Sequence, residues 1–208
     1  MRGFFITLEG PDGSGKSTQI APLADYLRRN GRTVFTTREP GGTAISDQVR
    51  HILMAMKNTT MHPRTEIMLF LSARAQLVEE VIRPRLETGE IVISDRYADS
   101  TLAYQGYGHG YDLTQLRQLL AFATGGLQPD MTILLDIDAE EGLRRRQNGG
   151  GEWNRLDAYQ LDFHQRVRNG YHELAKAEPQ RWKMLDGGEN PEMVQLALRK
   201  AVDDRLND

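Results

Sequence analysis

Short apolar runs alternate along the chain with longer segments in which apolar residues recur every three or four positions. This alternation is typical of βαβ units and predicts an α/β fold with a parallel sheet. The five predicted strands are residues 3–9, 33–37, 91–95, 131–137 and 182–185. The third and fourth are continuously apolar up to an aspartate, as expected for strands buried on both faces.

Amphipathic segments between these strands predict the helices that flank the sheet. The first helix follows Lys16 and ends near Asn30, where the next residue is a glycine. Further helices are predicted at 43–56, from 63 past 81, and at 112–123, 140–146, 157–177 and 191–202. Three glycines at 149–151 separate two of these helices and predict a flexible tip.

Composition and charge narrow the class of protein. The 208 residues show no repeat or linker, so one domain spanning 1–208 is expected. A formal net charge of −3 argues against non-specific nucleic-acid binding. The absence of cysteine excludes disulfides, thiolate metal sites and cysteine nucleophiles. The apolar start is too short for a signal peptide and no run reaches membrane-span length, so we expect a cytoplasmic protein.

A glycine-rich loop joins the first predicted strand to the first predicted helix. Its pattern, G-x-x-x-x-G-K-S, lets backbone N–H groups surround phosphate oxygens, and the helix N-terminus adds positive potential. We expect Lys16 to contact the β- and γ-phosphates and Ser17 to be a Mg²⁺ ligand. The residues predicted to bind a nucleoside triphosphate here are Gly10, Pro11, Asp12, Gly13, Ser14, Gly15, Lys16, Ser17 and Thr18.

The loop alone does not select a class of phosphate-loop protein. A GTPase switch is disfavoured because its guanine-reading Asn-Lys-x-Asp does not occur, and an ABC-type Leu-Ser-Gly-Gly-Gln is also missing. An ATP-driven switch or motor remains an alternative to an enzyme.

Two aspartates, Asp95 and Asp136, end similar apolar runs at the sheet edge where ligands bind in open α/β folds. Either carboxylate suits a Mg²⁺ ion or its water shell, and the spacing does not choose between them. The neighbouring Arg96 favours Asp95, since a site for two phosphorylated substrates needs both signs of charge. The alternative role for Asp95 is a cap of the strand end.

Arginines and an aromatic residue indicate a second, acceptor site. Arg38 and Arg96 follow two strands of the predicted sheet, and guanidinium groups bind phosphate with parallel hydrogen bonds. A surface ion pair with Glu39 or Asp95 is the alternative for these arginines, above all for Arg38. Phe70 and Arg74 are one helical turn apart, which suits stacking on a base and donation to a carbonyl, although Phe70 is also a candidate for the core.

Four segments together resemble the motifs of thymidylate (dTMP) kinases, in order and over nearly the whole chain. They are Arg38-Glu39-Pro40-Gly41-Gly42-Thr43, Phe70-Leu71-Ser72-Ala73-Arg74, Asp95-Arg96-Tyr97 and Ser100-Thr101-Leu102-Ala103-Tyr104-Gln105-Gly106. The resemblance implies the P-loop nucleoside-monophosphate-kinase fold with a mobile lid at about residues 144–156. It also implies Mg²⁺- and ATP-dependent phosphorylation of dTMP to dTDP by a homodimer.

The resemblance further assigns acceptor contacts by position. It implies that Arg38 and Arg96 hold the dTMP phosphate, that Phe70 stacks on thymine and that Arg74 bonds its O4. Thr101 corresponds to a contact with the N3 edge of the base, and Tyr104 to the ring that selects deoxyribose. Gln105 is expected to support the base or sugar, and Asp12 to contact the sugar 3′-hydroxyl.

Lid arginines are the remaining catalytic candidates beside Lys16 and Arg96. Arg144, Arg145, Arg146 and Arg155 flank the three glycines, although such a charge run is often just a solvated helix face. In the form of the family typified by the human enzyme, an arginine occupies the position of Gly13. The bacterial form has no arginine there and supplies its catalytic arginine from the lid, and this chain resembles the bacterial form. We expect Arg155 and Arg145 to be catalytic and Arg144 to bind ATP. Another nucleoside or nucleotide kinase, or a non-catalytic ATP-binding regulator, is the alternative function.

Overall fold

The computed structural model describes residues 2–149 and 153–207. Five parallel strands form one sheet in the order β2-β3-β1-β4-β5. The strands are β1 (Phe4–Glu9), β2 (Val34–Arg38), β3 (Ile91–Asp95), β4 (Met131–Asp136) and β5 (Trp182–Asp186). The predicted five-stranded parallel sheet is therefore confirmed, with ends that differ by one residue at several strands.

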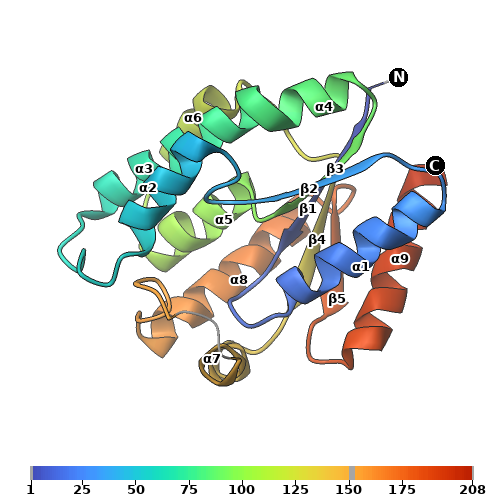
Figure 1. Cartoon of the computed structure of the whole chain (residues 1–208). Helices are drawn as coiled ribbons and strands as arrows, with labels where there is room; N and C mark the ends of the chain where they lie inside the picture. Colours follow the sequence, from blue (N-terminus) through green and yellow to red (C-terminus); the bar gives the residue numbers. More distant parts are fainter. Residues whose placement is uncertain (1, 150–152, 208) are drawn as a thin grey trace.

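Helices cover both faces of this sheet (Figure 1). The α-helices are α1 (Lys16–Arg29), α2 (Ala44–Met54), α3 (Pro63–Leu77), α4 (Arg83–Glu87), α5 (Ala98–Thr101), α6 (Leu113–Thr124), α7 (Ala139–Asn148), α8 (Leu161–Ala177) and α9 (Pro191–Asn207). Two π-helical segments, η1 (Val78–Ile82) and η2 (Leu102–Gly108), continue α3 and α5. The predicted tip at 149–151 lies mostly outside the described residues.

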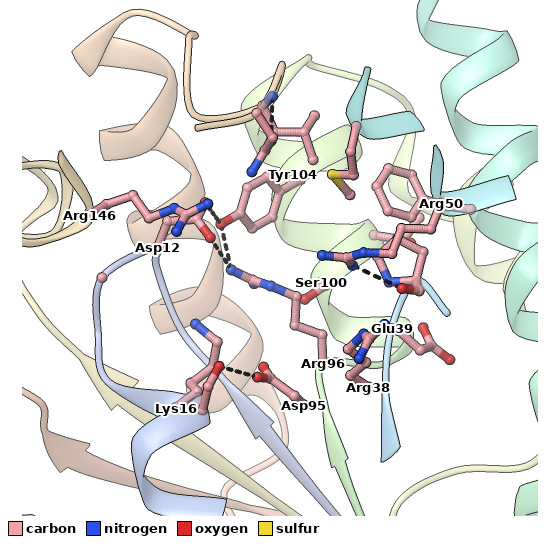
Figure 2. Close-up of a pocket in the computed structure, with 18 of the residues that line it drawn as sticks. Asp12, Lys16, Arg38, Glu39, Arg50, Asp95, Arg96, Ser100, Tyr104 and Arg146 are labelled. Carbon is pink, nitrogen blue, oxygen red and sulfur yellow. Dashed lines mark hydrogen bonds and ion pairs between the residues drawn. The ribbon is translucent and has the colours of Figure 1, made fainter. Parts of the chain in front are cut away.

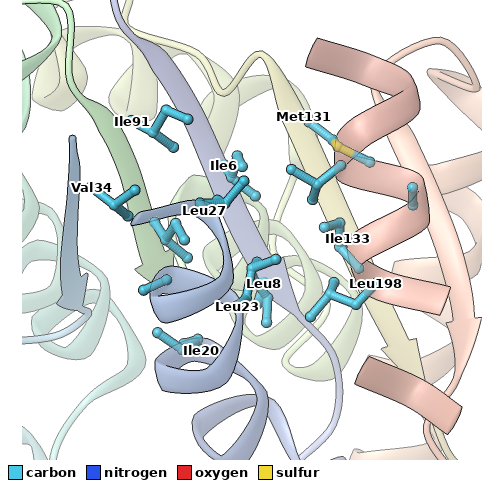
Figure 3. Close-up of a cluster of buried hydrophobic side chains, with 14 of the residues drawn as sticks. Ile6, Leu8, Ile20, Leu23, Leu27, Val34, Ile91, Met131, Ile133 and Leu198 are labelled. Carbon is cyan, nitrogen blue, oxygen red and sulfur yellow. The ribbon is translucent and has the colours of Figure 1, made fainter. Parts of the chain in front are cut away.

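One face of the sheet packs against α1 and α9. Alternate side chains of β1, such as Ile6 and Leu8, meet Leu23 and Leu27 of α1 and Leu198 of α9 (Figure 3). The side chain of Phe5, the residue before Ile6, points to the other face of the sheet and packs against the helices that cover it. Burial on both faces explains why the strands have continuous apolar sequences.

Two parts of the helical layer differ from the sequence prediction. Residues 98–108 are helical (α5 and η2) although no helix was predicted there, because Leu102, Ala103 and Tyr104 pack into the apolar cluster with α8. The helix predicted from 157 begins only at Leu161, because Asp157 accepts a hydrogen bond from the backbone N–H of Asn154 in a local turn.

The parallel order brings the carboxyl ends of β1, β2 and β3 to the same edge of the sheet. Leu8 lies in register with Asp95, and Arg38 lies in register with Asp95 on the other side. The segments that follow these three strands carry most of the predicted site residues.

Candidate active site

A cavity of about 520 Å³ opens at this edge of the sheet, and the phosphate loop and the predicted acceptor residues line it together. The lining residues of the loop and of α1 are Asp12, Gly13, Gly15, Lys16, Ser17 and Thr18. Those of the predicted acceptor side are Arg38, Phe70, Arg74, Arg96, Thr101, Tyr104 and Gln105. One cavity therefore contains the chemistry for binding a triphosphate and a second, phosphorylated molecule.

The phosphate loop is folded around the side chain of Lys16. The ammonium donates to the carbonyl oxygens of Gly10 at 3.0 Å and Pro11 at 2.9 Å, and to the Ser14 hydroxyl at 3.2 Å. Burial and the neighbouring Arg96 lower the pKa of Lys16 to about 8, against the opposing effect of nearby carboxylates. The lysine is thus positioned at the loop and poorly solvated before any phosphate binds.

Gly13 is the one loop residue whose lack of a side chain is imposed by a neighbouring helix. Its φ is +77°, and a Cβ there would overlap the carbonyl oxygen of Gly142 in α7. The loop and the helix that leads to the predicted lid are therefore in direct backbone contact.

Ser17 and Asp95 form the predicted magnesium pair. The Ser17 hydroxyl donates to Asp95 Oδ2 at 2.7 Å, the dashed line that reaches Asp95 in Figure 2. Asp136 is instead paired with Arg168 at 2.9 Å and with His172, both on α8. A hydroxyl and a carboxylate beside the phosphate loop are the hard oxygen ligands that suit Mg²⁺, so the geometry favours Asp95 over Asp136.

Arg96 is held in the centre of the cavity by an unusual backbone conformation. Its φ is +71°, in the left-handed region that costs a non-glycine residue roughly 1–3 kcal/mol. The guanidinium donates to Asp12 Oδ1 at 2.7 Å, and also to the Gly10 carbonyl and to three hydroxyls of the surrounding helices, those of Ser100, Tyr104 and Tyr171. This bonding compensates the strain and fixes one cation between the phosphate loop and the acceptor side.

Asp12 and Tyr104 form the contact between the phosphate loop and η2. The Tyr104 hydroxyl donates to Asp12 Oδ2 at 2.7 Å. Burial would raise the pKa of Asp12, but Arg96 and Lys16 outweigh it and lower the pKa to about 2. The Asp12 carboxylate is therefore ionised at neutral pH and able to accept a hydrogen bond from a substrate hydroxyl.

The predicted base reader lies on α3 and η2. Arg74 is 1% exposed and donates to Glu39 at 2.7 Å, to the Thr101 hydroxyl at 2.9 Å and to the Tyr97 carbonyl. Phe70, four residues earlier, is half-buried and borders the cavity, so it is not part of the closed core. The structure thus presents a ring and a fixed guanidinium on one helix face.

Arg38 lies at the exposed rim of the cavity. Its nearest ionic partner is Asp47 at 3.5 Å, rather than the Glu39 or Asp95 considered from sequence. Because both members of this pair are largely exposed, the interaction is weak and leaves Arg38 available to a bound anion.

The arginines of the predicted lid are not equivalent. Arg145 and Arg146 border the cavity, and Arg146 is paired with the buried Asp157 at 3.1 Å. Arg144 is exposed and paired with Glu141. Arg155 is 7% exposed, and its Nη2 lies 2.6 Å from Glu66 of α3, so in this conformation its side chain points away from the cavity.

Sequence reasoning missed Glu9, the last residue of β1. This fully buried carboxylate accepts hydrogen bonds from the Tyr97 backbone, the Ser100 hydroxyl and the Tyr171 hydroxyl. Burial, together with the charge of Asp99, raises its pKa to about 7. An acidic residue at the end of an apolar strand was the only available signal, since Tyr171 is 162 residues away.

Comparison with known proteins agrees with this geometry. The sequence model of the family described as Thymidylate kinase matches residues 8–197. A thymidylate kinase of Roseiflexus sp. is 54% identical, covering 97% of this chain and 94% of that protein, and one of Herpetosiphon aurantiacus is 49% identical, covering 97% and 96%. The crystal structure of thymidylate kinase from Ehrlichia chaffeensis superposes with a TM-score of 0.79 at 33% identity, covering 98% of this chain and 100% of that one. The chain therefore belongs to the thymidylate kinase family.

Proposed function

We propose that the protein transfers the γ-phosphoryl group of ATP to dTMP, giving ADP and dTDP. The observation that carries the proposal is the single cavity in which the phosphate loop faces Arg96, Tyr104, Phe70 and Arg74. A phosphate oxygen of dTMP attacks the γ-phosphorus, and the bond from that phosphorus to the β–γ bridging oxygen breaks. Such a transfer needs positioning and positive charge more than a covalent intermediate.

The residues have distinct roles in this proposal. Lys16 and the loop N–H groups hold the β- and γ-phosphates, while Arg96 and Arg38 hold the acceptor phosphate. Asp12 accepts from the sugar 3′-hydroxyl, and the Tyr104 ring fills the space of a ribose 2′-hydroxyl. The remaining acceptor contacts are those of the base with Phe70, Arg74, Thr101 and Gln105.

Mg²⁺ fits the Ser17–Asp95 pair, where it would neutralise phosphate charge during the transfer. Among the arginines predicted from the lid to be catalytic, Arg145 borders the cavity and is our candidate for contacting the transferring group. The catalytic role of Arg155 stays a prediction that this conformation does not support, and the role of Arg144 in binding ATP stays untested. Lid closure over ATP would expel water and protect the γ-phosphate from hydrolysis.

Homodimerisation and a cytoplasmic location stay predictions from resemblance and composition. Within the described residues, no helix has both the length and the hydropathy needed to cross a membrane.

An acceptor panel tests the proposal. ADP formation from ATP is measured with dTMP, dUMP, UMP, AMP and thymidine, and dTMP is expected to be the best acceptor. Thymidine outperforming dTMP would overturn the assignment, and equal use of UMP would contradict the role of Tyr104. Binding of ATP without phosphorylation of any acceptor would favour the regulatory alternative.

A further inference from the structure

We propose that Glu66 is a positioning residue that couples the acceptor wall to the lid stem, which we define as residues 153–160 between the lid tip and α8. Glu66 orients the amide of Gln105 and, through Arg155, fixes the two lid-stem residues that border the cavity. This inference rests on the proposed function, because it concerns how the dTMP site is shaped.

Glu66 is the acceptor at the centre of a buried polar cluster. Its side chain is 1% exposed, and Oε2 accepts from Arg155 Nη2 at 2.6 Å and from the Tyr159 hydroxyl at 3.2 Å. Its other oxygen, Oε1, accepts from Gln105 Nε2 at 2.8 Å. The cluster joins α3, η2 and the lid stem, three segments that are far apart in the sequence.

The carboxylate is ionised in spite of its burial. Burial would raise the pKa of Glu66, but His109, whose Nε2 lies 3.4 Å from Oε1, and the hydrogen bonds from Gln105 and Arg155 outweigh it and lower the pKa to about 2. The rings of His109, Tyr159 and Phe163 contact one another around the cluster, with centroids 4.4–5.1 Å apart. The surroundings therefore have a low polarity, in which a change of hydrogen-bond donor or acceptor is costly.

Glu66 determines which way the Gln105 amide faces. An ionised carboxylate only accepts hydrogen bonds, so the amide nitrogen of Gln105 must point towards it. The carbonyl oxygen of Gln105 is then fixed on the opposite side of the amide group. Since Gln105 borders the cavity, Glu66 decides the polarity that this residue offers to a base.

Arg155 anchors the lid stem on the acceptor side. Its Nε donates to the carbonyl of Leu53 at 3.0 Å, near the C-terminus of α2, where helix carbonyls lack intrahelical partners. The residues on either side of it, Asn154 and Leu156, both border the cavity. Because the Arg155 side chain is bonded to Glu66 and α2, its two neighbours are held facing the cavity.

A purely structural role for Glu66 makes a different prediction. Buried ion pairs often contribute little net stability, and loss of one partner usually lowers the stability of the whole fold. In that case a Glu66 variant would melt at a lower temperature but bind both substrates as the wild type does. The positioning role predicts that dTMP is affected selectively.

The test uses Glu66→Gln in the full chain. The new amide can donate to Gln105, which favours reversal of the Gln105 amide, and Arg155 loses its counter-charge. We expect KM for dTMP to rise about tenfold, the effect of one mispaired hydrogen bond, while KM for ATP stays within about twofold. Hydrogen exchange of the backbone amides at 153–157 should become faster in the same variant.

The matched control is Glu79→Gln, which removes an exposed carboxylate that pairs with Arg83 outside the cavity. It should leave both KM values and the exchange of the lid stem unchanged. If Glu66→Gln does not fold, Glu66→Asp keeps the charge but withdraws the carboxylate, and it should raise KM for dTMP alone.

The outcomes separate this inference from the proposed function. Failure of the wild type to phosphorylate dTMP rejects the proposed function and, with it, the inference. Activity of the wild type with an unchanged KM for dTMP in a folded Glu66 variant rejects the inference alone. A parallel rise of both KM values would also reject it.

Discussion

The lowered pKa of Lys16 predicts a pH dependence of ATP binding. The free protein holds this lysine at a pKa of about 8, because burial and Arg96 disfavour its charge. Bound phosphates favour the charged form, so ATP binds the protonated state preferentially. Affinity should therefore be largely constant below the pKa and fall as the pH rises through it.

The magnitude follows from the protonated fraction. Lys16 is about nine-tenths protonated at about pH 7 and about one-tenth protonated at about pH 9. The dissociation constant of a non-hydrolysable ATP analogue should thus rise about tenfold over this interval, equivalent to about 1.4 kcal/mol. Isothermal titration calorimetry with Mg²⁺ present measures this constant directly.

Lys16→Arg provides the control, since guanidinium stays protonated over the whole interval. Tyr104 and Tyr171, whose pKa values burial raises well above the ordinary value, also stay protonated and do not contribute to the slope. A change of less than about twofold in the wild type, or the same slope in Lys16→Arg, would refute the assignment to Lys16.

Two further substitutions probe the loop and its metal pair. Gly13→Ala should lower the melting temperature and abolish ATP binding, because the new Cβ overlaps Gly142. The control is Gly31→Ala, which has a similar positive φ but lies in open space and should lower the free energy of unfolding by only roughly 1 kcal/mol. Equal melting temperatures of the two variants would contradict the overlap. Asp95→Asn should raise the Mg²⁺ concentration for half-maximal activity at least about tenfold, whereas Asp136→Asn should leave it near the wild-type value. A Mg²⁺ titration of the kinase reaction compares them, and the opposite ranking would return the metal to Asp136.

The parts of the fold and site that the sequence predicts are those with strong local signals. Strands buried on both faces need continuous apolar residues, so β3 and β4 can be predicted from the sequence alone. The phosphate loop depends on the spacing of Gly10, Gly15 and Lys16, because the backbone itself binds the ligand. These features involve residues that are adjacent in the chain.

The Glu66 cluster could not be predicted, because its partners are distant in the sequence. Gln105 is 39 residues away and Arg155 is 89 residues away. Glu66 lies in the first turn of α3, and a glutamate at this position is also typical of a helix N-terminus that faces solvent. Its position therefore does not indicate that it is buried. The direction of the Arg155 side chain likewise depends on the turn around Asp157, which sequence patterns described as helix.

The contact between Gly13 and Gly142 limits how this enzyme can change. A side chain at position 13 cannot enter unless α7 moves away from the loop. Since α7 also carries Arg145 and Arg146, that movement would carry both arginines away from the phosphate loop. Substitutions at position 13 should therefore be tolerated only together with changes in α7, so that the phosphate loop and this helix vary as a pair rather than independently.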